Sequence, residues 1–227
     1  MGAATRPEMN SVGDSFAWAF RDSAWLGKML VQGLIAIIPI VGWIAMTGWL
    51  MMAYDNARAG RNELPPAGFH LGRGIEIFLV FLIYGVVLSI PSAILYSIAI
   101  VAASNSGDNA GAVSAPLFTL AGLAGVATTL LTRFLYPSLI VNTARGGLAG
   151  GLNVQHVWQL SSLNVTNTVV AALIIFVASI IGGLGFLVCI GFIFTIPYEN
   201  TITAAAAAWF DQQQSAPGAA PPVTPTT

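Results

Sequence analysis

The sequence predicts an all-α protein, a polytopic transmembrane helical bundle of about six spans with proline and glycine breaks and short interfacial helices. Of its 227 residues, 56% are hydrophobic and only 7% are charged, whereas about a quarter of an ordinary soluble domain is charged. The mean hydropathy is +0.79. So few charges cannot cover the surface of a soluble fold of this size. A soluble globular domain and a disordered chain are therefore excluded.

Composition divides the chain into three segments. Residues 1–23 are mostly polar and contain a predicted short helix at 14–22, with Phe16, Ala19 and Phe20 on one face. We expect this helix to lie in the membrane interface; the alternative is a simple extension of the first span. Residues 24–210 form the transmembrane domain, and residues 211–227, rich in Gln, Ala, Pro and Thr, are predicted to be a disordered tail.

The first apolar run, residues 24–54, is too long for one upright helix and short for two. Its centre, Ile38-Pro39-Ile40-Val41-Gly42, permits either one long kinked helix or a hairpin of two short helices. A hairpin places every flanking basic residue on the cytoplasmic side, as the positive-inside rule favours. We therefore predict the hairpin from these residues: Arg21, Lys28, Arg58, Arg61 and Arg73.

The remaining apolar runs supply four further spans. They are residues 75–103, residues 116–142, and two helices at 167–183 and 186–210 that a Gly-Gly-Leu-Gly interruption separates. The six spans place both termini in the cytoplasm, and we expect a multi-pass protein of a prokaryotic plasma membrane. Residues 104–115 are small and polar and suit an outer loop.

Two similar short motifs follow apolar helices at the predicted cytoplasmic side. One is Asn56-Ala57-Arg58-Ala59-Gly60, and the other is Asn142-Thr143-Ala144-Arg145-Gly146-Gly147. One interpretation is a parallel internal repeat that relates spans two and three to spans four and five. The other is that Arg and Gly commonly end membrane helices at the cytoplasmic face.

The stretch from Trp25 to Leu64 resembles a family of prokaryotic membrane proteins, domain of unknown function 4013. The residues that carry the resemblance are Trp25, Lys28, Gly33, the Ile38-Pro39-x-x-Gly42 break, Gly48-Trp49, Arg58, Gly60 and Glu63-Leu64-Pro65. A later pattern runs from Ile190-Gly191 through Pro197-Tyr198 to Phe210-Asp211-Gln212. Pro66 and Ala67 depart from the family's acidic-Trp step. The resemblance covers about residues 14–212 and implies an architecture, but no chemistry.

Arg133 is the most informative charge in the apolar segments. It lies about 25 Å along the fourth predicted span at about 1.5 Å per residue, near the inner edge of a hydrocarbon layer about 30 Å thick. It is interpreted as a snorkelling arginine, as half of a structural ion pair, or as a site for an anion or lipid phosphate. Glu199 is the natural ion-pair partner, and Asp55 and Glu76 are alternatives.

Glu199 and Asn200 follow Pro197 in the last span. A proline frees a backbone carbonyl one turn earlier, and broken transporter helices use such carbonyls to bind ions. The alternative is a kink whose polar residues form hydrogen bonds to neighbouring helices. The candidate intramembrane polar residues are therefore Arg133, Glu199, Asn200, Asp55 and Glu76.

No catalytic set, metal cluster or nucleotide-binding loop is visible, and we expect neither enzymatic activity nor a cofactor. Two histidines, His70 and His156, are too few for a zinc site, the single Cys189 is predicted to be a packing residue, and the net charge of −1 argues against nucleic acid. We expect an integral membrane protein that acts as a scaffold or accessory subunit. Its partners would be membrane lipids and a protein partner or second copy. The alternative is a transporter or channel for a small solute or lipid.

Overall fold

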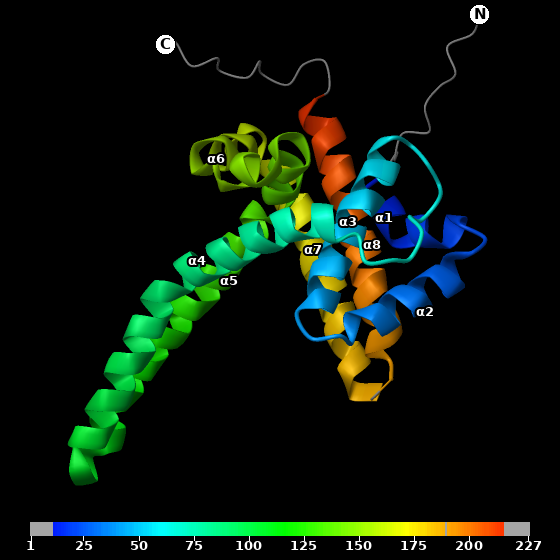
Figure 1. Ribbon diagram of the computed structural model, residues 1–227. Coiled ribbons are helices and arrows are strands. Elements are labelled where there is room, and N and C mark those ends of the chain that lie inside the picture. Colours follow the sequence, from blue (N-terminus) through cyan, green and yellow to red (C-terminus); the bar gives the residue numbers. More distant parts are fainter. Residues whose placement is uncertain (1–10, 189, 216–227) are drawn as a thin grey trace, which may run out of the picture. The chain divides into compact units, whose positions relative to one another are not determined.

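The computed structural model describes residues 11–188 and 190–215, apart from the side chain of Asp108. These residues form α-helices and short 3-10 helices without strands, which confirms the all-α prediction (Figure 1). Cys189 and residues 1–10 and 216–227 of the two predicted terminal segments lie outside the described residues. In chain order the elements are α1 (Asp14–Ala17), η1 (Trp18–Arg21), α2 (Trp25–Ala36), α3 (Val41–Arg58), α4 (Leu71–Asn105), η2 (Gly107–Asn109), α5 (Ala110–Leu152), α6 (Val154–Leu163), α7 (Val165–Leu184), η3 (Gly185–Val188) and α8 (Phe192–Gln214).

The described chain forms two compact units. The first unit contains the described residues up to Val80 and from Leu135 onwards, and the second contains Phe81–Phe134. Helices α4 and α5 each contribute to both units.

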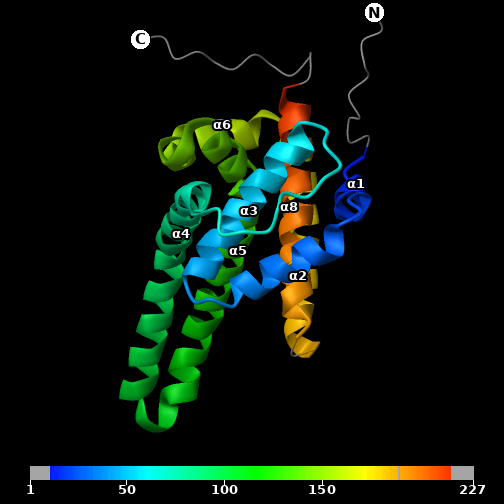
Figure 2. The ribbon, with the colours of Figure 1, turned by 45° about the vertical axis from the view of Figure 1, so that its right-hand side comes forward.

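The first apolar run folds as two helices, α2 and α3, joined by a tight turn (Figure 2). Ile40 adopts φ 63° and ψ −60°, and the N–H of Val41 donates to the Pro39 carbonyl over 2.7 Å, which makes a γ-turn. A Cβ on Gly42 would collide with the Ile35 carbonyl oxygen, so this turn requires glycine. The break is therefore a turn and not a kink, as the hairpin interpretation expects. With 12 residues, α2 is only about 18 Å long.

Helix α8 is the central helix of the first unit and contacts α7, α3 and α2. The run of alanines from Ala204 to Ala208 is fully buried, so small side chains let neighbouring helices approach closely. At Gly33 of α2, a Cβ would collide with the carbonyl oxygen of Ile193 in α8. These small residues therefore serve packing within the chain.

The N-terminal helix is found where the sequence predicts it, as α1 and η1. It contacts α8 and buries Trp18 and Ala19. At the other end, α8 continues through Asp211 to Gln214, into the segment assigned to the disordered tail. Asp211 is buried, and its ion pairs explain why the helix extends that far.

The second unit is a helical hairpin made by the second part of α4 and the first part of α5, which run side by side in both ribbon views (Figures 1 and 2). Between these helices, the Thr128 hydroxyl donates to the Leu88 carbonyl over 3.1 Å. Tyr96 and Phe118 also lie together, with 6.4 Å between ring centroids. Pro91 lies inside α4 without interrupting it.

Three helices in the described chain are long and apolar enough to cross a membrane. They are Leu71–Asn105, Ala110–Leu152 and Val165–Val188. They contain the predicted spans at 75–103, 116–142 and 167–183. The count of six spans stays a prediction, as does the division of the chain into three segments.

Candidate functional site

A buried carboxylate, Asp211, binds two arginines and a tyrosine in the first unit. The hydroxyl of Tyr54 donates to its Oδ2 over 2.8 Å, and Nε of Arg58 lies 2.7 Å from the same oxygen. A guanidinium nitrogen of Arg145 contacts its Oδ1. Only 1% of the Asp211 side chain is exposed, against 48% and 42% of the Arg58 and Arg145 side chains. This cluster of Tyr54, Arg58, Arg145 and Asp211 is called the Asp211 cluster below.

Local sequence explains how the two arginines reach one acid. Tyr54 and Arg58 are four residues apart and therefore share one face of α3. Helix α3 ends in a Schellman motif: the N–H of Arg61 donates to the Asn56 carbonyl over 2.9 Å, and Gly60 takes φ 71°. Arg145 stands directly before Gly146 and Gly147, where the backbone of α5 leaves the helical conformation.

The two similar motifs of the sequence thus occupy similar local positions. In each, the arginine precedes a glycine of positive φ by two residues, and those glycines are Gly60 at 71° and Gly147 at 59°. Both arginines bind Asp211. The parallel repeat of the flanking spans stays a prediction.

The Asp211 cluster carries a formal net charge of +1, since two guanidinium groups face one carboxylate. A buried carboxylate loses its hydration and is stable only when donors replace the water. Tyr54, Arg58 and Arg145 supply those donors, from helices α3 and α5. The cluster thereby fixes the end of α8 against two other segments of the first unit.

Sequence reasoning does not find this acid, because composition places Asp211 in the predicted disordered tail. A signal was present: the apolar run from Ala204 to Phe210 continues the helix directly up to Asp211.

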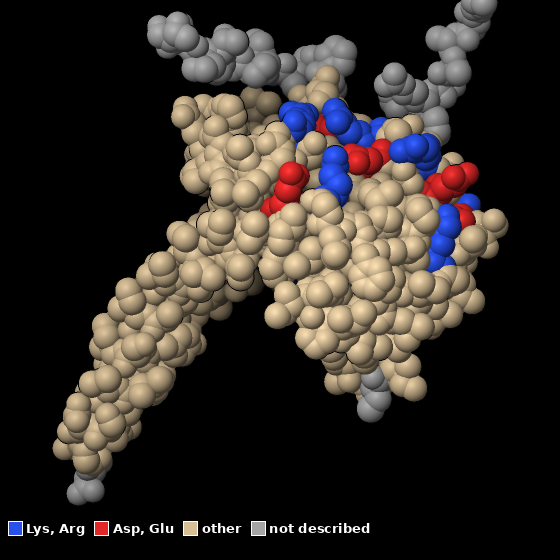
Figure 3. All heavy atoms as spheres, in the orientation of Figure 1, with Lys and Arg blue, Asp and Glu red and all other residues tan. Residues whose placement is uncertain are grey.

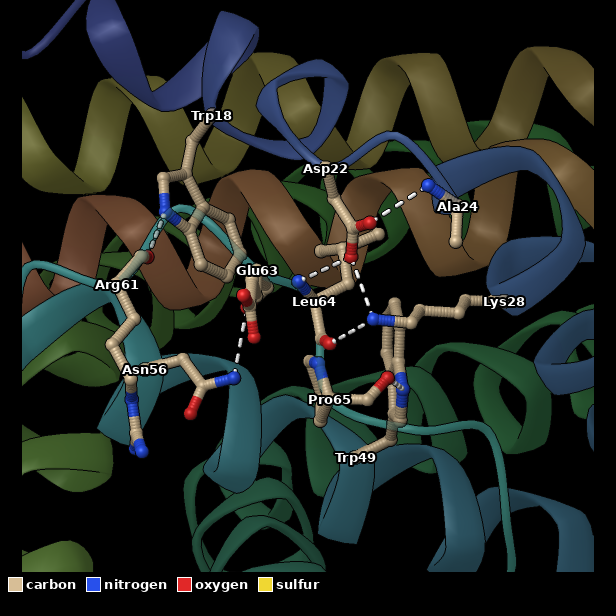
Figure 4. A network of polar contacts seen from close by, with 10 residues as sticks. All are labelled: Trp18, Asp22, Ala24, Lys28, Trp49, Asn56, Arg61, Glu63, Leu64 and Pro65. Atoms are coloured by element: carbon tan, nitrogen blue, oxygen red, sulfur yellow. Dashed lines mark hydrogen bonds and ion pairs between the residues drawn. The ribbon is translucent and has the colours of Figure 1, made fainter.

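A second buried acid, Asp22, fixes the linker between α3 and α4 (Figure 4). Its carboxylate accepts the N–H groups of Ala24 and Leu64, both over 2.8 Å, and the Lys28 ammonium over 2.7 Å. The same ammonium donates to the Leu64 carbonyl over 2.7 Å. Burial alone would raise the pKa of Asp22, but Lys28 and the two backbone donors outweigh it and lower the pKa below its ordinary value.

Three further side chains hold the same linker by its backbone. Indole N–H groups of Trp18 and Trp49 donate to the carbonyls of Arg61 and Pro65, over 3.1 and 3.2 Å. Asn56 donates to the Glu63 carbonyl over 2.8 Å. Two residues that carry the family resemblance, Lys28 and Trp49, thus bind the backbone of the linker at Leu64 and Pro65.

Asp55 and Glu76, two of the predicted site residues, lie in the first unit. Asp55 pairs with Arg73 over 3.0 Å, and both side chains are more than 40% exposed, so this is a surface ion pair. Glu76 is half-buried, and a Cβ on Gly147 would lie 3.3 Å from its Oε2. The structure therefore places Glu76 beside the break in α5.

Glu199 and Asn200 lie in α8 after Pro197 and are half-buried. The carboxylate of Glu199 lies directly against Gly182 of α7, because a Cβ on this glycine would collide with Oε2. The Asn200 amide donates to the Ile196 carbonyl of its own helix over 2.9 Å.

Arg133 is half-buried in α5 and belongs to the second unit. Its pairing with Glu199 stays a prediction. Among the described residues, no group of three or more His, Cys, Asp or Glu side chains could hold a metal ion. The chemistry of the Asp211 and Asp22 sites is that of ion pairs and hydrogen bonds between segments of the chain.

Comparison with family models, curated proteins and solved structures gave one match. Residues 31–196 match the model of a family described as protein of unknown function (DUF4013). No curated protein and no solved structure matches the chain. Because the matched region covers more than half of the sequence, the chain belongs to the DUF4013 family of proteins of unknown function.

Proposed function

We propose that the protein is a non-catalytic integral membrane protein that acts as a scaffold or accessory subunit. The observation that carries this proposal is that three acidic side chains are used in ion pairs within the first unit, whereas the long helices leave apolar surface exposed. Asp22, Asp55 and Asp211 form ion pairs with other segments of the first unit. The long helices instead expose apolar side chains: the most hydrophobic windows of α4 and α5 are only 17% and 11% buried.

The exposed apolar surface of the second unit supports contact with lipid or with a protein partner. Outward-facing aliphatic side chains follow both helices of the hairpin, including Val87, Ile94, Leu123 and Leu130 at 54–63% exposure. Such an extended apolar surface is unstable in water. Helix α7 adds a small-residue site, where Gly183 is exposed and a Cβ would meet nothing within 4 Å. Small exposed residues of this kind allow another helix to approach closely.

The distribution of charge supports a cytoplasmic location for both termini. On the face of the first unit that Figure 3 shows, Lys, Arg, Asp and Glu side chains gather in one band. Basic residues from α3 and α5 contribute to the Asp211 cluster, and Lys28 of α2 contributes to the contacts around Asp22. By the positive-inside rule, that end of the unit faces the cytoplasm of a prokaryotic cell.

The scaffold role is tested on the full chain, purified in mild detergent and in native-lipid nanodiscs. We expect a partner or second copy at fixed stoichiometry, by light scattering and mass spectrometry. Gly183→Leu should abolish this association, because it fills the close-approach site on α7. Gly85→Leu is the matched control, since Gly85 is another exposed helical glycine with open space around it. A wild-type protein that is monomeric and free of stoichiometric partners in both preparations contradicts the proposal.

A transporter or channel is the second candidate, and the position of Glu199 favours it. This carboxylate lies between α7 and α8 beside Gly182, one turn or less from Pro197. An acid among apolar helices is a typical element of ion and proton pathways. The test is collapse of a pH gradient in proteoliposomes, read with an internal pH dye. A transporter predicts collapse by the wild type and its loss in Glu199→Gln, while equal gradients in loaded and empty vesicles reject proton transport.

A further inference from the structure

A pocket of about 390 Å³ lies in the first unit, between the end of α5 and helix α6. Asn142 and Arg145 of α5 line it, with His156, Gln159 and Ser162 of α6. Two leucines, Leu160 and Leu163, complete the lining. The pocket thus combines nitrogen and hydroxyl groups with an apolar wall.

The charge of this pocket favours an anion. Its described lining residues include one arginine and one histidine but no carboxylate. Arg145 contacts Asp211 through one guanidinium nitrogen, and a guanidinium carries five N–H donors in a planar fork. Asp211 is already bound by Arg58 and Tyr54, so it does not neutralise the whole charge of the cluster. A positive charge remains at the pocket wall.

The surroundings of the pocket favour an amphiphilic anion. Val154 and Trp158 of α6 are 65% and 55% exposed, and Leu163 of the pocket wall is 40% exposed. Val157 and Ser161 of the same helix are buried. A short helix with an exposed tryptophan and aliphatic side chains is typical of the membrane–water interface. A ligand with a phosphate next to acyl chains would meet the polar groups of the pocket and its two leucines, Leu160 and Leu163.

A second polar pocket of the first unit lacks this combination. Its volume is about 550 Å³, and its lining mixes three cations with two acids, Asp22 and Glu63. Lys28 in that pocket is already bound to Asp22 and the Leu64 carbonyl. An anion would therefore meet both signs of charge there.

We propose that the pocket between α5 and α6 binds the phosphate of an anionic phospholipid. Arg145 would bind the phosphate oxygens, with His156, Asn142 and Gln159 as further donors, and the leucines would contact the glycerol and the first acyl carbons. This inference rests on the proposed membrane location but not on the scaffold role.

The test is a titration of the full chain in a neutral detergent. Short-chain phosphatidylglycerol, short-chain phosphatidylcholine and glycerol 3-phosphate are added separately, and bound lipid is counted by native mass spectrometry. We expect saturable binding of phosphatidylglycerol, with at least about tenfold weaker binding of the other two ligands. Gln159→Glu should weaken phosphatidylglycerol binding by about tenfold or more, because the added carboxylate would repel the negatively charged phosphate of the lipid. Gln155→Glu is the matched control, since Gln155 is exposed on the same helix and does not line the pocket.

Each other result overturns the proposal. Equal binding of phosphatidylcholine shows that the pocket does not recognise the negative charge of the lipid headgroup. Equal binding of glycerol 3-phosphate shows a site for free phosphate esters instead of lipid. Equal loss, or no loss, in the two Glu variants places the lipid elsewhere, provided that circular dichroism shows both folded. Partition of the chain into the soluble fraction would instead refute the membrane location on which the inference depends.

Discussion

Arg58 and Arg145 contact the two different oxygens of one buried carboxylate, Asp211. The arginines come from similar motifs at the ends of two helices, and the acid comes from a third helix. Three chain segments that are distant in sequence therefore meet at one ionic site. This geometry predicts that the site holds the first unit together.

Replacement of Asp211 by Asn should strongly destabilise the protein. The change leaves two guanidinium groups facing each other without their counter-ion. Because the arginines are half-exposed, we expect the free energy of unfolding to fall by about 2–3 kcal/mol. Asp55→Asn removes one acid from a surface pair with Arg73 and should cost less than about 1 kcal/mol. Thermal unfolding in detergent measures both, and equal melting temperatures would contradict the role of Asp211.

Gly33 should tolerate no side chain, whereas Gly27 in the same helix should. A Cβ at Gly33 collides with the Ile193 carbonyl of α8, but one at Gly27 meets nothing within 4 Å. Gly33→Ala is therefore expected to separate α2 from α8 and lower the melting temperature. Gly27→Ala should leave it unchanged or raise it, since alanine favours a helix by about 1 kcal/mol. A similar small effect of both changes would refute the close contact between α2 and α8.

The contacts around Asp22 should weaken in acid. Because the folded-state pKa of Asp22 lies below the ordinary value of 3.8, its stabilising effect is complete above that value and is lost as the pH falls through the folded pKa. Melting temperatures measured from about pH 6 down to about pH 3 should therefore fall more steeply in the wild type than in Asp22→Asn. Parallel curves for the two proteins would show that Asp22 does not contribute to this pH dependence.

Ile40 should be replaceable by glycine with a gain in stability. Its φ of 63° is costly for a β-branched residue, by about 1–2 kcal/mol, and its side chain is 68% exposed. Glycine relieves the strain at little loss of packing. Ile38→Gly, two residues away at a position without positive φ, should destabilise instead, and chemical denaturation in mixed micelles compares the two. A loss of stability in Ile40→Gly would argue against a strained turn.

Much of the fold follows from local sequence. Hydropathy predicts the spans at 75–103, 116–142 and 167–183, which lie in three helices of membrane-spanning length. Pro39 and Gly42 predict a break between α2 and α3, and the flanking basic residues favour the hairpin that the structure shows. The motifs around Arg58 and Arg145 are also visible as helix ends. Local patterns do not show which distant acid neutralises an arginine, because that depends on how helices pack. For this reason Asp211 and Asp22 were missed, while Asp55, which is visible in sequence, proved to be in a surface ion pair.

Membrane integration is the claim on which the proposals depend, and alkaline carbonate extraction of isolated cell membranes tests it most directly. The untagged full chain is expected to stay in the membrane pellet after high-speed centrifugation, because α4, α5 and α7 expose apolar surface of membrane-spanning length. Release of the folded, monodisperse protein into the carbonate supernatant would contradict the account.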